Sequence, residues 1–303
     1  MDQIAQLPDD FFVTSSQFTK TVYRDSYPEL DVTQDSFSQK GKVIIITGAS
    51  QGLGREAFAA SFAKAGAKAI VLVARNAQGL EATSQDIKTI NPDISVLVRS
   101  VDIRDQGAVR KLYADIKSTF GTADVLINNA GCGKSALPMK EIDAADFWYD
   151  FEVNVKGALL MTQEFLRLVG ATKPATIINI TSAAAIAVIP TTSSYSLSKL
   201  VQVQMQRFVA VENPNIVAVS LHPGGVLTSI TKPAFVRFSS DTFALAGGVA
   251  VWLATEQARF MNGRYMGVNW SVGELVERRE EIVEKALLFV ELQGSFGKAQ
   301  FEK

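Results

Sequence analysis

Two residues of the sequence, Tyr195 and Lys199, have the types and the spacing for proton transfer. They stand four positions apart where a helix is predicted to begin, so both side chains share one face of it. A phenol with a pKa of about 10 is protonated at neutral pH, and a nearby ammonium group would lower that pKa by stabilising the phenolate. Tyr195 would then donate a proton to a carbonyl oxygen, or recover it in the reverse direction. Alone, a Tyr and a Lys at this spacing usually belong to an ordinary surface helix.

Polar residues that accompany this pair follow the ends of predicted strands. Ser182 comes directly after the strand-like run 176–181, and its hydroxyl would hold a substrate oxygen. The runs 128–131 (Asn-Asn-Ala-Gly) and 223–228 (Pro-Gly-Gly-Val-Leu-Thr) end two further strands, and Asn154 is a polar residue in an apolar helix. Since open α/β sheets bind ligands at the carboxyl ends of their strands, these residues are expected to meet at one edge.

The elements that must position these residues alternate along the chain. Apolar, β-branched runs are typical of strands buried on both faces, and they occur at 43–47, 69–74, 94–99, 124–128, 176–181, 216–221 and 265–270. Helical stretches separate them, at 53–66, 76–90, 105–120, 144–170, 194–212 and 242–256. The pattern predicts an α/β protein: a Rossmann-like, doubly wound parallel sheet of about seven strands with helices on both faces.

The chain is expected to form one domain with two extensions. Residues 1–41 lack a sustained period and are predicted to be an N-terminal extension that wraps the surface. No break in composition interrupts the next segment, so 42–272 is predicted to be a single Rossmann-fold catalytic domain. Residues 273–303 are predicted to be a C-terminal helical extension, with one amphipathic helix at 274–291. Its apolar face carries Leu275, Val276, Ile282, Val283, Ala286, Leu287 and Val290.

A glycine-rich turn joins the first predicted strand to the first helix. Gly48, Gly52 and Gly54 stand where the backbone must turn tightly and where a helix N-terminus offers free N–H groups to a pyrophosphate. Glycines at this spacing are a weak signal alone and a strong one between a strand and a helix. The turn therefore predicts dinucleotide binding, and the alternative is a tight turn with no ligand.

The same turn also matches the nucleophile elbow of hydrolases, with Ser50 as nucleophile and His222 in the order that hydrolases use. An elbow lies on a central strand that other strands precede, whereas the residues before Val43 contain no strand-like run. Pro and Gly follow His222 directly, and the elbow gives Gly54 no role. The hydrolase interpretation is the weaker one.

The end of the second strand indicates which dinucleotide binds. An acidic residue there would accept hydrogen bonds from the ribose 2′-OH of NAD, but the sequence has Ala74 followed by Arg75. Because a guanidinium matches a 2′-phosphate in charge and shape, NADP(H) is favoured. The alternative is an ordinary solvated arginine at a strand end.

Composition excludes several other functions. The 303 residues carry 30 Lys+Arg against 31 Asp+Glu, a net charge of −1, which gives no electrostatic case for nucleic acid or an anionic membrane as a partner. With one His and one Cys, no metal site is expected. No apolar run is long enough for a membrane span, and neither terminus resembles a targeting signal, so a cytoplasmic location is expected.

Together these motifs resemble those of the short-chain dehydrogenase/reductase family over residues 42–270. Thr47, Gly48, Gly52 and Gly54 match its TGxxxGxG pattern, residues 128–131 its NNAG, and residues 223–228 its PGxVxT loop; Asn154, Ser182, Tyr195 and Lys199 match its catalytic tetrad. The whole chain is similar to fungal secondary-metabolism reductases with extended termini. Members that prefer NADP often carry Lys or Arg inside the glycine loop, where this sequence has Gln51, so Arg75 is the main candidate for the 2′-phosphate.

The resemblance implies roles for individual residues. Asp102 would hold the adenine, Val226 and Thr228 the carboxamide, Lys199 the nicotinamide ribose, and Asn154 a water of the proton relay. The expected cofactor-binding set is Gly48, Ser50, Gln51, Gly52, Leu53, Gly54, Arg75, Asp102, Asn129, Ala130, Gly131, Tyr195, Lys199, Pro223, Gly224, Val226 and Thr228. Members of the family are commonly homodimers or homotetramers, so either assembly is expected.

These observations predict an NADPH-dependent carbonyl reductase that converts a ketone or aldehyde of an apolar substrate to the alcohol, reversibly, in secondary metabolism. Two alternatives stay open: an NAD-dependent alcohol dehydrogenase working oxidatively, and a non-catalytic sensor of NADP(H). The segments 183–190 and 229–241 are expected to line the substrate pocket, with Phe235 and Phe238 as contacts. Cys132 is expected to be a small packing residue, and His222 a structural one.

Overall fold

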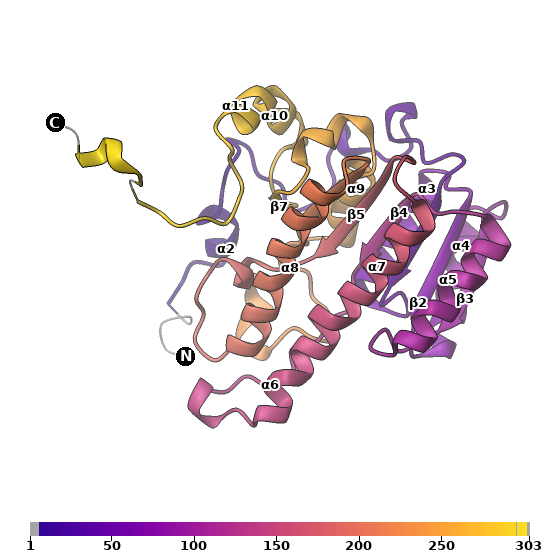
Figure 1. The fold of residues 1–303 in the computed structure, drawn as a ribbon, viewed down its shortest axis with the longest axis horizontal. Helices are drawn as coiled ribbons and strands as arrows, with labels where there is room; N and C mark the ends of the chain where they lie inside the picture. Colours follow the sequence, from indigo (N-terminus) through magenta and orange to yellow (C-terminus); the bar gives the residue numbers. More distant parts are fainter. Residues whose placement is uncertain (1–5, 295, 302–303) are drawn as a thin grey trace.

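Seven parallel strands form one sheet in the order β3-β2-β1-β4-β5-β6-β7 (Figure 1). The structure is a computed structural model that describes residues 6–294 and 296–301. The strands are β1 (Val43–Thr47), β2 (Ala69–Ala74), β3 (Ser95–Ser100), β4 (Val125–Asn128), β5 (Ala175–Ile180), β6 (Ile216–His222) and β7 (Tyr265–Gly267). The predicted Rossmann-like fold is confirmed. The strand order reverses between β1 and β4, the position at which open α/β sheets bind ligands.

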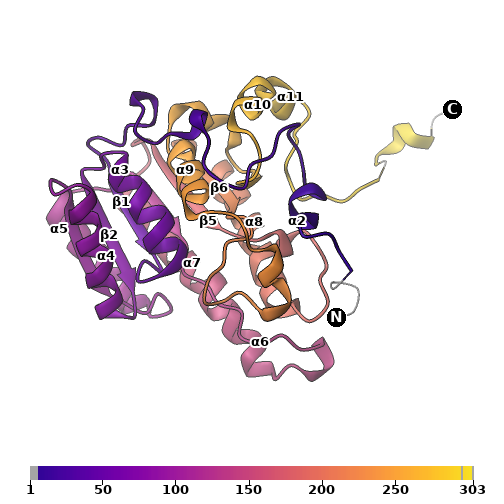
Figure 2. The ribbon, with the colours of Figure 1, turned by 180° about the vertical axis from the view of Figure 1, so that it is seen from behind.

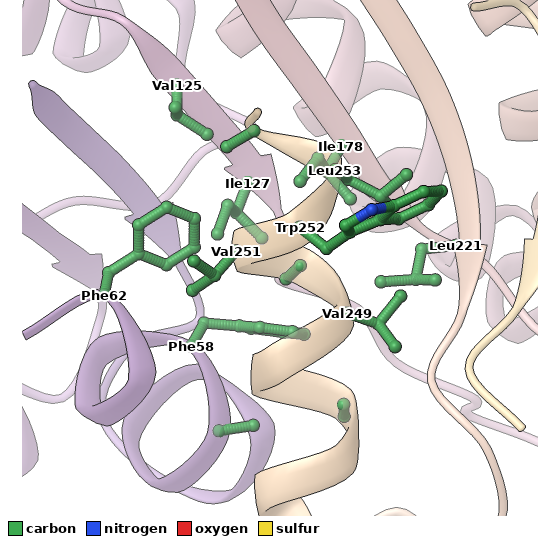
Figure 3. Packing of buried hydrophobic residues seen from close by; sticks show 14 of the residues in the cluster. Phe58, Phe62, Val125, Ile127, Ile178, Leu221, Val249, Val251, Trp252 and Leu253 are labelled. Carbon is green, nitrogen blue, oxygen red and sulfur yellow. The ribbon is translucent and has the colours of Figure 1, made fainter. Parts of the chain in front are cut away.

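Helices cover both faces because successive residues of a strand point to opposite sides of the sheet. They are α3 (Ala60–Lys64), α4 (Ala77–Ile90), α5 (Gln106–Phe120), α7 (Ala158–Val169), α8 (Ser193–Glu212) and α9 (Phe243–Leu253). Ile44 and Ile46 face α3, α4 and α9, whereas Ile45 faces α5, α7 and α8. Figure 3 shows the first of these cores, in which Phe58, Phe62 and Val251 pack against the sheet.

Short helical turns lie in the loops between these elements. They are Pro28–Leu30, Asp35–Phe37, Met139–Glu141, Ala183–Ala185, Pro233–Phe238, Glu256–Met261 and Lys298–Phe301. No described helix is long and apolar enough to cross a membrane.

Two of the predicted strands differ from expectation. β3 is an edge strand with part-exposed side chains, not one buried on both faces, and its Arg99 pairs with Asp115 of α5 at 2.8 Å. β7 ends at Gly267, three residues early, because the chain then turns toward the N-terminal segment and Trp270 forms an antiparallel bridge with Val22. Charged side chains on an exposed edge discourage pairing with other sheets.

Two helices contain π-helical segments that the sequence did not reveal. The first is Leu53–Ala59, which continues the glycine turn into α3. The second is Glu152–Gly157, which divides the predicted helix 144–170 into α6 (Ala144–Phe151) and α7. π-Helical segments are rare overall, and those that occur are often found at functional sites. Here one begins beside the glycine turn and the other carries Asn154.

The prediction of a helix over 274–291 was wrong. Two short helices, α10 (Val272–Glu277) and α11 (Arg279–Glu284), take its place and meet at Arg278. α11 ends at Glu284, two residues before Ala286, whose positive φ is incompatible with a continued helix. The chain then returns to the sheet, where the Tyr265 N–H donates to the Leu288 carbonyl at 3.0 Å. On the expected apolar face, Leu275 and Ile282 are buried, but Val283 is 51% exposed.

The N-terminal extension does more than wrap the surface. It begins with α2 (Phe11–Thr14), runs past α10, and reaches the side of the sheet covered by α9 (Figure 2). Tyr27, Leu30 and Phe37 are buried in the same core as α9, and Leu30 lies against Gly248 of that helix. Residues 1–5, 295, 302 and 303, on which the expectation of no targeting signal partly rests, lie outside the described residues. The proposed division at 41 and 272 stays a prediction.

Leu30→Ala should lower the free energy of unfolding by about 2–5 kcal/mol, the usual cost of a cavity in a packed core. Leu292, which is 84% exposed, provides the matched control. Leu292→Ala should change stability by less than about 0.5 kcal/mol. Urea denaturation followed by circular dichroism measures both, and equal values for the two variants would show that the extension lies outside the core.

Candidate active site

Tyr195, Lys199 and Ser182 meet at the carboxyl edge of the sheet, as predicted. α8 carries Tyr195 and Lys199 on one face, and the Lys199 Nζ lies 5.7 Å from the centre of the Tyr195 ring. Ser182 directly follows Thr181, the residue after β5, and forms a hydrogen bond with the Tyr195 hydroxyl. The Lys199 Nζ also donates to the Ile180 carbonyl at 2.8 Å, which holds the ammonium beneath the sheet edge.

The Lys199 ammonium alone does not lower the pKa of Tyr195 as expected, and the further lowering expected from an oxidised nicotinamide ring stays a prediction. Burial raises the pKa of the Tyr195 phenol, the hydrogen bond from Ser182 partly opposes that rise, and the negative charge of Asp150 adds to it. Burial also lowers the pKa of the Lys199 ammonium to about 8. Desolvation is the largest cause of both shifts, because burial disfavours the charged form of each group. Tyr195 is therefore a protonated phenol at neutral pH, the state that a proton donor requires.

Asn154 lies in the π-helical segment and is completely buried. Its Oδ1 accepts from the Cys132 N–H at 2.9 Å, and its Nδ2 donates to the Cys132 carbonyl at 2.9 Å and to the Ser198 Oγ at 2.8 Å. The amide thus joins the loop after β4 to α8. That Asn154 also anchors a water stays a prediction.

Asp150 is a buried carboxylate beside the site that the sequence analysis did not single out. Its Oδ1 accepts from the Lys134 N–H at 2.8 Å and lies 3.3 Å from the Cys132 Sγ. Its Oδ2 accepts from the Ser194 hydroxyl at 2.6 Å, one residue before Tyr195. Buried charges need such donors to offset their desolvation. The only available signal was an acid amid aromatic residues, in the run 147–151 (Phe-Trp-Tyr-Asp-Phe).

The glycine turn is packed tightly against the end of β4. A Cβ added to Gly54 would lie 2.2 Å from the Gly48 carbonyl, so only glycine allows the helix to start this close to the strand. The Asn129 Nδ2 donates to the Thr47 carbonyl at 2.8 Å and to the Gly48 carbonyl at 3.2 Å. These contacts fix the turn from the neighbouring strand.

A cleft of about 370 Å³ opens over this turn and contains most of the expected cofactor-binding residues. Its lining includes Gly48, Ser50, Gln51, Gly52, Leu53, Arg75, Asp102, Asn129, Ala130, Gly131, Tyr195, Lys199, Pro223 and Thr228. Gly54 is buried beneath the cleft, whereas Gly224 and Val226 line the neighbouring cavity. A Cβ at Gly131 would crowd the Lys199 Nζ and the Asn154 Oδ1 at 3.2 Å. The glycine-lined floor and helix start fit a dinucleotide.

One end of the cleft carries charged groups. The Arg75 Nη1 lies 3.4 Å from the Tyr149 hydroxyl. Arg104 stands over the Tyr149 ring and pairs with Asp102 at 2.6 Å. The guanidinium of Arg104 holds the pKa of the Asp102 carboxyl below its usual range, with backbone N–H donation from the same residue contributing. Asp102, expected to hold the adenine, therefore already has a partner.

A second cavity, of about 540 Å³, adjoins the cleft at Tyr195. Ser182, Ala183, Ala184 and Ile189 line one side of it, and residues 230–235 with Phe238 line another, as predicted for these two segments. The N-terminal extension supplies Phe12, Val13 and Arg24, which the sequence analysis did not anticipate. Without tertiary contacts, an aperiodic segment gives no signal that it reaches a pocket.

The structure does not favour the hydrolase interpretation, because a triad histidine needs an acid bonded to its Nδ1 and His222 has none among the described residues. The His222 Nδ1 is buried without a hydrogen-bond partner among the described residues. Burial lowers the pKa of the imidazole to about 4, against an opposing effect from Asp241, so the ring is neutral at physiological pH.

Comparison with known proteins agrees with this geometry. The sequence profile of the short chain dehydrogenase family matches residues 42–236. The short chain dehydrogenase mpl6 of Monascus purpureus is 34% identical over 295 residues, which are 93% of this chain and 99% of that protein. The short chain dehydrogenase andI of Emericella variicolor is 31% identical over 275 residues, which are 88% of this chain and 93% of that protein. The chain belongs to the short-chain dehydrogenase family.

Solved structures share the fold of this short-chain dehydrogenase. A 7α-hydroxysteroid dehydrogenase complexed with NADH and 7-oxo glycochenodeoxycholic acid has a TM-score of 0.70 and 25% identity, over 80% of this chain and 97% of that one. A short chain dehydrogenase of Shigella flexneri complexed with NADP has a TM-score of 0.71 and 22% identity, over 78% of this chain and 99% of that one. The family is one of oxidoreductases that use a nicotinamide cofactor. Over residues 6–294 and 296–301, no cluster of His, Cys, Asp and Glu could hold a metal ion.

Asp150→Asn should speed alkylation of Cys132 in this short-chain dehydrogenase. Burial, followed by the charge of Asp150, raises the pKa of the Cys132 thiol to about 12, and the amide removes that charge while keeping an acceptor for Lys134 N–H. The thiolate fraction, and with it the rate of reaction with iodoacetamide at pH 8.5, should rise about tenfold for each unit by which the pKa falls.

Cys132 is the single cysteine of the chain, so the measured alkylation rate belongs to this residue. Asp146→Asn is the matched control, because Asp146 lies on the same helix but is solvent-exposed. Equal rates in the two variants would contradict the assigned influence of Asp150.

Proposed function

We propose that this short-chain dehydrogenase is an NADP(H)-dependent carbonyl reductase that acts on a ketone or aldehyde of an apolar substrate. The observation that carries the proposal is the position of Tyr195, whose side chain borders both the glycine-floored cleft and the apolar cavity. A proton donor at that junction can act on a substrate in the cavity while a dinucleotide occupies the cleft. When bound, NADPH would supply the hydride that the carbonyl carbon accepts.

Each residue of the tetrad has a role in this proposal. Tyr195 gives its proton to the carbonyl oxygen, for which its raised pKa leaves the phenol fully protonated at neutral pH. Ser182 donates a hydrogen bond to the same oxygen and so orients the carbonyl. Lys199 presents a cation beneath the junction, where it would hold the cofactor ribose, and Asn154 fixes the loop after β4 against α8. Lys199 and Asn154 are buried, which strengthens their interactions because water screens them little.

The preference for NADP(H) rests on Arg75 at the charged end of the cleft. Its guanidinium is exposed and lies beside the Tyr149 hydroxyl. Asp102 pairs with Arg104, so no described carboxylate in this part of the cleft is left unpaired to accept hydrogen bonds from a ribose 2′-OH. A 2′-phosphate suits this environment better than a free diol.

We also propose that the substrate belongs to secondary metabolism. The protein would form a homodimer or homotetramer and would be located in the cytoplasm. An NAD-dependent dehydrogenase working oxidatively is the second candidate, and the complex of the 7α-hydroxysteroid dehydrogenase with NADH is the observation in its favour. A sensor without turnover would not need Tyr195 and Ser182 joined at the end of an apolar cavity.

Tyr195→Phe should lower kcat for NADPH-dependent ketone reduction by at least about 100-fold, because the ring keeps its packing and loses only the transferable proton. Affinity for NADPH, measured by fluorescence titration, should change less than about twofold. A variant that keeps wild-type kcat would rule out Tyr195 as the proton donor.

Arg75→Ala should raise KM for NADPH by about tenfold or more and leave KM for NADH nearly unchanged, since the charge-assisted bonds to the 2′-phosphate are lost. Arg110→Ala, at an exposed arginine of α5, serves as the control and should alter neither value. A wild-type rate with NADH that exceeds the rate with NADPH would overturn the proposed cofactor preference.

A further inference from the structure

The outer wall of the apolar cavity comes from a part of the chain far from the tetrad. Phe12 and Val13 of α2 border the cavity, and so does Asp9 just before that helix. None of the family motifs lies in this segment. The match to the family profile begins at residue 42, which comes after the segment. The wall therefore comes from a part of the chain that lies outside the family profile.

Phe12 belongs to an aromatic cluster with the two phenylalanines expected to contact substrate. Its ring centre lies 4.9 Å from that of Phe238 in an edge-to-face arrangement and 6.0 Å from that of Phe235. Phe235 and Phe238 are 6.5 Å apart. All three rings line the cavity, and Phe12 and Phe235 are only part-buried, so surface of both rings stays available to a ligand.

Polar contacts hold the segment in this position. The Trp270 Nε1 donates to the Ser16 carbonyl at 2.9 Å, and Arg237 pairs with Asp9 at 3.5 Å and hydrogen-bonds the Leu7 carbonyl. Further along, the Arg24 guanidinium pairs with buried Asp241 at 2.7 Å, and Asp241 also accepts from the Gly225 N–H at 2.6 Å. These contacts join the wall to the loop after β6. They hold Phe12 in a fixed position at the cavity.

The cavity offers both polar and aromatic groups to a ligand. The Tyr195 and Ser182 hydroxyls border it, and so does the aromatic cluster beside α2, together with the charged residues Asp9, Arg24 and Lys232. A volume of about 540 Å³ suits a ligand larger than a simple ketone. Aromatic rings contribute most to binding when they meet another aromatic ring in an offset or edge-to-face arrangement.

We propose that Phe12 determines substrate specificity, and that with Phe235 and Phe238 it selects carbonyl compounds whose body is an aromatic ring system. The proposal rests on the proposed function, because it takes the cavity at Tyr195 to be the substrate site. The carbonyl group lies at Tyr195 and Ser182, and the ring system lies among the three phenylalanines. A purely structural Phe12 would instead affect all substrates equally, through the stability of the wall.

Phe12→Ala is compared with Phe11→Ala, a matched control on the same helix whose ring touches Phe12 but does not line the cavity. The probes are 2-acetylnaphthalene and 2-butanone, both assayed with NADPH. Phe12→Ala should raise KM for 2-acetylnaphthalene at least about tenfold and change KM for 2-butanone less than about twofold, since only the larger ketone reaches the rings. Phe11→Ala should leave both values near wild type.

Phe12→Leu keeps an apolar filling without the aromatic face, and should show most of the loss for 2-acetylnaphthalene while unfolding at the wild-type temperature. An equal rise of KM for both ketones in Phe12→Ala, or full retention of naphthyl affinity in Phe12→Leu, would overturn the proposal.

Calorimetric binding of 2-acetylnaphthalene without cofactor separates this proposal from the proposed function. Weaker binding in Phe12→Ala by a protein that reduces no carbonyl would support the aromatic site and refute the reductase. Ketone reduction that ignores Phe12 would refute the aromatic site alone. A wild-type protein that neither binds nor reduces 2-acetylnaphthalene also overturns the specificity proposed here.

Discussion

Parallel strands of one sheet all end at the same edge, and this geometric constraint gathers the site from loops that lie far apart in the sequence. The glycine turn after β1, the loop after β4, Ser182 after β5 and the loop after β6 all emerge there. Because the strand order reverses between β1 and β4, the loops diverge and leave room for the cleft. α8 then brings Tyr195 and Lys199 to the same edge from the face of the sheet.

Two buried charges of opposite sign flank the phenol that this edge presents. The Lys199 ammonium is held by a backbone carbonyl, and the Asp150 carboxylate by a backbone N–H and the hydroxyl of Ser194. Neither pairs directly with the other, so each depends on hydrogen bonds for its solvation. Asp150 and burial together favour the protonated phenol, while the hydrogen bond from Ser182 favours the phenolate. The resting protonation state of Tyr195 is thus set by the surroundings and not by Lys199 alone.

The alternation of strands and helices was predictable because buried parallel strands appear in the sequence as continuous apolar runs. The motifs were predictable because each consists of a few residues close together in the sequence. The features that were missed depend on tertiary contacts. The helix expected over 274–291 breaks at Arg278 and ends at Glu284, after which Leu288 meets Tyr265, a partner more than twenty residues earlier. The predicted fall of the Tyr195 pKa took account of a neighbouring cation and an oxidised nicotinamide ring but not of desolvation. Asp150 and Phe12 carry no motif at all, and only packing reveals where they lie.

The tetrad and the wall of the apolar cavity come from different parts of the chain, so mutations can change one without the other. The residues that border the far end of the cavity lie in a segment that precedes β1 and holds none of the tetrad. Mutations there, including insertions before α2, can reshape the cavity while the hydroxyls of Ser182 and Tyr195 and the glycine turn stay in place. On the proposed function, changes in the N-terminal extension would therefore alter which substrates the cavity admits without altering the reaction.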